Sequence, residues 1–99
     1  MKMPVRPRRE DAELLAIQAL GFIAEEPERL NRFLGTTGIP LAHIRAAAGE
    51  PDFLAGVLEH MLGDESLLIA FAASAGIDPA EIVHARDTLG RRQGTEKQP

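Results

Sequence analysis

Three histidines, His43, His60 and His84, are the side chains of this chain best suited to bind a transition metal, because cysteine is absent. Metal-binding histidines usually recur at fixed spacings, as in H-E-x-x-H, and neither that pattern nor a Cys/His cluster is present. His60 and Asp64 are four residues apart, but we expect Gly63 between them to break the helix. The sequence therefore predicts surface histidines, no metal site and no cofactor.

The chain also offers few residues for nucleophilic or acid–base catalysis. Its only serines, Ser66 and Ser74, lie in stretches typical of ordinary helix. Paired carboxylates at positions 25–26 and 64–65 stand at helix boundaries, where acids compensate the helix dipole without any catalytic role. The glycines are dispersed, so that no glycine-rich loop is available to bind a phosphate. We expect no catalytic residue and a protein that is not an enzyme.

Charge divides the 99 residues into an acidic body and basic ends. Residues 1–9 carry four basic side chains and no acid, whereas residues 10–89 carry 14 acids against four arginines. We expect a single helical domain over 10–89 between disordered tails, 1–9 and 90–99. An alternative is that the basic tails bind an anionic partner.

The sequence gives no sign of a membrane segment. The basic start lacks the apolar segment of a signal peptide, and no run is long enough to span a bilayer. We therefore expect no membrane contact.

Residues 14–48 and 52–86 are two copies of one pattern, related by a shift of 38 positions. The identical pairs fall at apolar or turn positions, as duplicated packing requires. They are Leu20 and Leu58, Leu30 and Leu68, Phe33 and Phe71, Gly38 and Gly76, Ile39 and Ile77, Ala42 and Ala80, Ile44 and Ile82, and Ala47 and Ala85.

Prolines and glycines mark the ends of six expected helices. These helices cover about 11–24, 27–38, 40–49, 51–63, 64–76 and 79–89. The third is the least regular, because Pro40 stands where the second copy has a capping acid, Asp78. No alternation typical of strands competes. The fold class predicted is all-α: a compact bundle of five or six short helices in two pseudo-symmetric three-helix units. Glycines inside helices, Gly21, Gly35 and Gly56, suggest close helix–helix approach.

Residues 72–85 have the spacing of a helix-turn-helix, with Gly76 at the turn. The helix that would read DNA, however, begins with the acidic segment 78–81 and adds Asp87 against one arginine, Arg86. Binding to phosphates depends on Lys and Arg. We therefore expect this unit to serve packing, and nucleic acid to be a poor candidate partner.

Four apolar residues, Leu14, Ile17, Leu67 and Ile69, occur in one copy of the repeat but not in the other. Either they seal the seam between two units whose central helices are 11–24 and 64–76, or they form a surface patch for a partner or for dimerisation. We favour the seam and a monomer, since so small a domain needs central helices to close its core. The patch remains the possible interaction surface.

Several segments, 19–22, 29–34, 53–58, 64–68 and 71–72, resemble a family of small alphaproteobacterial proteins known only as a domain of unknown function. The resemblance covers about residues 12–90. It implies a bacterial, cytoplasmic and all-helical protein, and it supplies no catalytic residue, cofactor or partner.

The function that we predict is a non-catalytic protein–protein interaction or regulatory module. The alternative is a nucleic-acid-associated protein that uses the helix-turn-helix-like unit or the basic tails. The sequence names no partner, pathway or oligomeric state.

Overall fold

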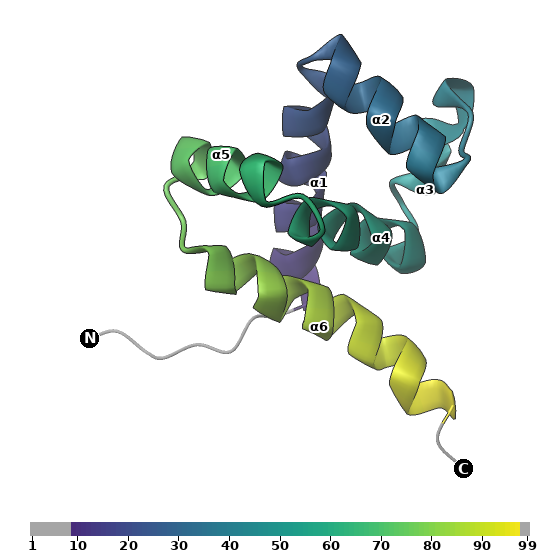
Figure 1. Ribbon diagram of the computed structural model, residues 1–99. Coiled ribbons are helices and arrows are strands. Elements are labelled where there is room, and N and C mark those ends of the chain that lie inside the picture. The colour runs from purple at the N-terminus through teal and green to yellow at the C-terminus, as the bar shows by residue number, and fades with distance from the viewer. Residues whose placement is uncertain (1–8, 98–99) are drawn as a thin grey trace.

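The computed structural model describes residues 9–97, and it confirms the all-α class, because these residues form helices and turns without any strand (Figure 1). The elements are α1 (Arg9–Ala24), α2 (Pro27–Thr37), the 3-10 helix η1 (Leu41–His43), α3 (Ile44–Ala47), α4 (Pro51–Leu62), α5 (Glu65–Ala75) and α6 (Pro79–Lys97). The tail predicted at the N-terminus lies, except for Arg9, outside the described residues.

Local signals in the sequence set most of the helix ends. Prolines occupy the first positions of α2, α4 and α6, where a missing N–H costs nothing. Gly38 and Gly76 follow α2 and α5 with φ angles of 75° and 71°, the only positive values in the described chain. The turn predicted at Gly76 is thus confirmed. Asp64 caps α5, since its Oδ1 accepts the N–H of Leu67 at 3.2 Å.

The centre of the molecule is formed by α1, α4 and α6, which pack on one another (Figure 1). The expectation that the helices near 11–24 and 64–76 form the centre is right for α1 and wrong for α5. The long helix α6 takes that place because it buries Ile82, Ala85 and Leu89, one side chain per turn. Figure 1 shows α2 and α6 at opposite ends of α1.

The repeat is visible in individual positions. Phe33 and Phe71 are both buried, as expected, and the glycine turns after α2 and α5 match. The third helices differ: Ile82 is fully buried in α6, whereas its counterpart Ile44 is only partly buried in a segment split between η1 and α3. The arrangement as two pseudo-symmetric units is therefore not confirmed.

Two expectations based on glycines need correction. The end of α6 predicted near Gly90 moves to Lys97, because Gly90 does not adopt the left-handed conformation that ends α2 and α5. The close helix approach expected at Gly21, Gly35 and Gly56 is absent, because a β-carbon at any of the three would meet no atom of a neighbouring helix within 4 Å. These interior glycines are not required by packing.

The two kinds of glycine should respond oppositely to alanine. Gly35→Ala should raise the free energy of unfolding by about 0.5–1 kcal/mol, because alanine is the better helix former. Gly76→Ala should lower it by about 1 kcal/mol, because its β-carbon is strained at positive φ. Urea unfolding followed by circular dichroism measures both. Equal stability of Gly76→Ala and the unmodified protein would contradict the turn geometry.

Candidate functional site

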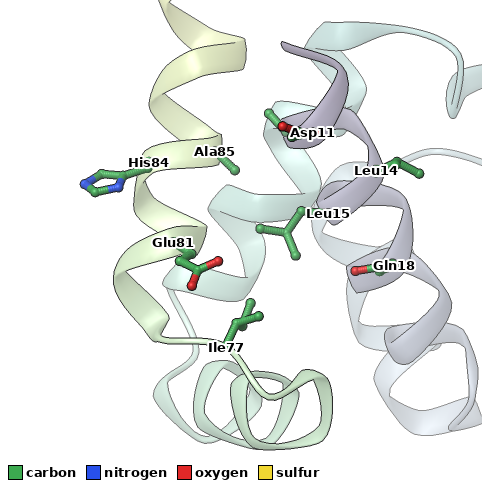
Figure 2. A pocket seen from close by; sticks show the side chains of 9 residues that line it. Asp11, Leu14, Leu15, Gln18, Ile77, Glu81, His84 and Ala85 are labelled. Atoms are coloured by element: carbon green, nitrogen blue, oxygen red, sulfur yellow. The ribbon is translucent and has the colours of Figure 1, made fainter. Parts of the chain in front are cut away.

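A groove of about 600 Å³ runs between α1 and the first part of α6 (Figure 2). In Figure 2, Leu15 of α1 points into the space between the helices, Ile77 lies at one end, and His84 points outward. The described residues that line it are Asp11, Ala12, Leu14, Leu15, Gln18, Ile77, Glu81, His84 and Ala85.

The groove exists because small residues face each other where the two helices meet. Ala12 of α1 and Ala85 of α6 are almost fully buried and belong to the core. Their methyl groups close the floor but cannot fill the space above it. Leu15 and Ile77 are partly buried and provide apolar walls. The result is a hydrophobic depression that opens to solvent beside the core.

The rim of the groove is acidic. Asp11 and Glu81 contribute carboxylates from opposite helices, and Gln18 adds a neutral amide. Both carboxylates are solvent-exposed, and no Lys or Arg is among the lining residues that the structure describes. An apolar floor beneath an acidic rim suits a ligand that combines apolar side chains with positive charge.

The structure separates the four apolar residues singled out in the sequence. Leu14, Ile17 and Ile69 are 58%, 45% and 55% exposed, whereas Leu67 is 6% exposed. The preference for a buried seam is therefore wrong for the first three, because α6 closes the core in place of α5. Only Leu14 lines the groove, and Ile17 lies one turn further along α1.

Sequence reasoning missed one further exposed apolar residue, Leu41, which is 61% exposed on η1. It was detectable, since its counterpart under the 38-residue shift is Pro79 and the position is therefore also unshared. Leu41 does not line the groove. It provides a matched control for Leu14.

The three histidines differ in their burial. His43 and His84 are exposed, whereas His60 is partly buried with its ring at 5.2 Å from that of Phe33. Among the side chains that the structure describes, no three His, Asp or Glu residues are grouped so that they could hold a metal ion.

The chain bends by 103° between α5 and the part of α6 that ends at Gly90, an angle within the range of helix-turn-helix units. The described exposed side chains of α6 include Glu81 and Asp87, and Arg86 is bound to Asp87 at 2.9 Å and to Glu59 at 3.4 Å. Among the side chains of α6 that the structure describes, up to Gly90, little positive charge is left free of an ion pair. No single described helix is long and apolar enough to cross a bilayer; α5 and α6 pass such a test only as a bent pair, by length and composition.

Comparison with models of known protein families gives a match. The sequence model of a family described as "Protein of unknown function (DUF3572)" matches residues 9–92. No curated protein and no solved structure matches the chain. The family match confirms the resemblance to a domain of unknown function; it shows neither an alphaproteobacterial origin nor an activity.

The difference in burial between Leu14 and Leu67 can be tested by replacing each with alanine. Leu14→Ala should lower the free energy of unfolding by less than about 1 kcal/mol, because the side chain is already in water. Leu67→Ala should lower it by about 2 kcal/mol or more, because it leaves a cavity beside the core. Urea unfolding of the two variants decides. Equal losses would show that Leu14 is buried and that the groove is closed.

Proposed function

We propose that this chain, which belongs to the DUF3572 family, is a non-catalytic protein–protein interaction module whose partner binds in the groove between α1 and α6. The observation that carries the proposal is Leu14, which is 58% exposed at the edge of an apolar groove. Single exposed apolar residues are ordinary on protein surfaces. A leucine that is exposed at the edge of an apolar groove is typical of a binding surface.

The partner that fits this groove is an amphipathic helix with a basic flank. Helices bind in grooves through apolar side chains spaced three and four residues apart. Leu15, Ile77 and Leu14 would contact those side chains, and burial of such residues drives association. Asp11 and Glu81 would face lysines or arginines at the edge of the helix, which favours encounter and fixes orientation.

Two alternatives to this helix are a second copy of the chain and nucleic acid. A second copy of the chain could bury Leu14 and Ile17, although we favour a monomer. Nucleic acid is supported by the 103° bend between α5 and α6 and opposed by the acids exposed on α6. We further propose a bacterial, cytoplasmic protein, in line with the resemblance noted in the sequence.

The test compares two leucines of nearly equal exposure. A tagged chain is used to isolate a partner from native cells. The affinity of that partner's binding segment for the purified protein is then measured by titration calorimetry. Leu14→Glu should weaken this affinity by about tenfold or more, because it places a charge in the apolar contact. Leu41→Glu should change it by about twofold or less, because Leu41 lies outside the groove.

Two results would overturn the groove as the binding surface. One is an affinity that Leu14→Glu leaves unchanged, and the other is an equal loss with Leu41→Glu. Sedimentation equilibrium of Ile17→Lys examines the homodimer, since a folded variant that loses self-association would make a second copy the occupant. An electrophoretic shift whose midpoint rises steeply with salt would favour nucleic acid instead.

A further inference from the structure

A second pocket lies where α2, α4 and α5 meet, and its chemistry differs from that of the groove. It has a volume of about 230 Å³. Its lining is Arg29, Arg32, His60, Asp64, Ser66 and Leu67. Two arginines from α2, a histidine from α4 and a serine from α5 thus share one small space with a single carboxylate.

Arg29 is held in place by an aromatic ring. Its guanidinium carbon lies 4.4 Å from the centre of the Phe22 ring, which in turn contacts Phe71 at 5.4 Å. Stacking occupies the face of a guanidinium and leaves its N–H groups free along the edge. Among the described residues, no carboxylate forms an ion pair with Arg29. Its charge is therefore oriented in advance and not neutralised.

Arg32 follows one turn later on the same face of α2. Its contact with Asp64 is long, at 3.7 Å, and the Arg32 side chain is largely exposed, so the ion pair contributes little. Asp64 is already engaged through Oδ1 with the N–H of Leu67. Arg32 can consequently turn from Asp64 toward a stronger acceptor without breaking a strong interaction.

The remaining polar groups add donors. Burial lowers the pKa of His60 below its ordinary value of 6.5; Asp64 opposes this effect and Arg32 adds to it. His60 is thus neutral at pH 7 and serves as a hydrogen-bonding group. Ser66 supplies a hydroxyl from the first turn of α5, where the helix carries partial positive charge.

We infer that this pocket binds a phosphoryl group, as free phosphate or as a small phosphate ester, with Arg29 and Arg32 as its main donors. Two guanidinium groups and a hydroxyl offer more donors than the two oxygens of a carboxylate can accept, and they suit a tetrahedral dianion. The pocket is smaller than sites for drug-sized ligands, which favours a compact anionic group. This inference is independent of the groove and of the function proposed for it.

Asp64 distinguishes a binding pocket from a merely structural cluster. Its carboxylate lies on the pocket wall and repels an anion, so that Asp64→Asn should tighten phosphate binding while asparagine still caps α5. A purely structural role for Asp64 would leave phosphate affinity unchanged.

The experiment titrates the full-length chain with inorganic phosphate, glycerol 3-phosphate or acetate at constant ionic strength and follows backbone amide shifts by NMR. Arg29→Met and Arg32→Met remove the charge while keeping an apolar stem. Arg45→Met is the control, because Arg45 is an exposed residue of α3 that does not line the pocket. Each pocket variant should weaken phosphate binding by about tenfold, and the control by about twofold or less. Asp64→Asn should tighten it by about threefold or more.

Tighter binding of inorganic phosphate would identify the free ion as the ligand, and tighter binding of glycerol 3-phosphate would identify an ester. Thermal melting monitors folding, so that affinities are compared only among variants that melt cooperatively. The inference is overturned if shifts with phosphate do not saturate, if acetate binds as tightly, or if Arg45→Met loses as much affinity as the pocket variants.

Discussion

The packing of α6 against α1 and α4 is the interaction on which the rest of the structure depends. Ile82, Ala85 and Leu89 place one buried side chain per turn between the two other helices. On α1 the facing residues are mainly small, with Ala12, Ala16 and Ala19 fully buried. Small residues let helix axes approach closely, and beside Ala12 and Ala85 they also leave the space that becomes the groove. Core and candidate binding surface therefore arise from the same choice of residues.

The outer helices are attached by phenylalanines. Phe33 of α2 meets the Phe53 ring of α4 at 5.9 Å, and Phe71 of α5 meets the Phe22 ring of α1 at 5.4 Å. Aromatic residues bury large areas, so each holds its helix with few contacts. Between α2, α4 and α5 the polar side chains that cannot enter the core line the second pocket. The acidic groove and the arginine pocket thus present opposite charge on different parts of one small domain.

Local chemistry explains which features the sequence could predict. Proline starts, the Asp64 cap and the turn at Gly76 act over a few residues, and the structure agrees with them. The buried phenylalanines also followed, because the repeat marks them. Which helices are central did not follow, since the repeat treats α3 and α6 alike although only α6 is long enough to cross both α1 and α4. The groove and the arginine pocket require contacts between distant segments, which no local pattern contains.

Whether a partner covers the groove in cells can be measured by thiol labelling, because the chain contains no cysteine. Leu14→Cys and Leu41→Cys introduce single thiols at positions that are 58% and 61% exposed. A membrane-permeant maleimide is applied to the purified proteins and to native cells that produce them, and the labelling rates are measured by mass spectrometry. If a partner covers the groove, both positions are labelled at similar rates in the purified proteins, and position 14 alone is labelled more slowly in cells. Equal rates at both positions in cells would contradict the proposal.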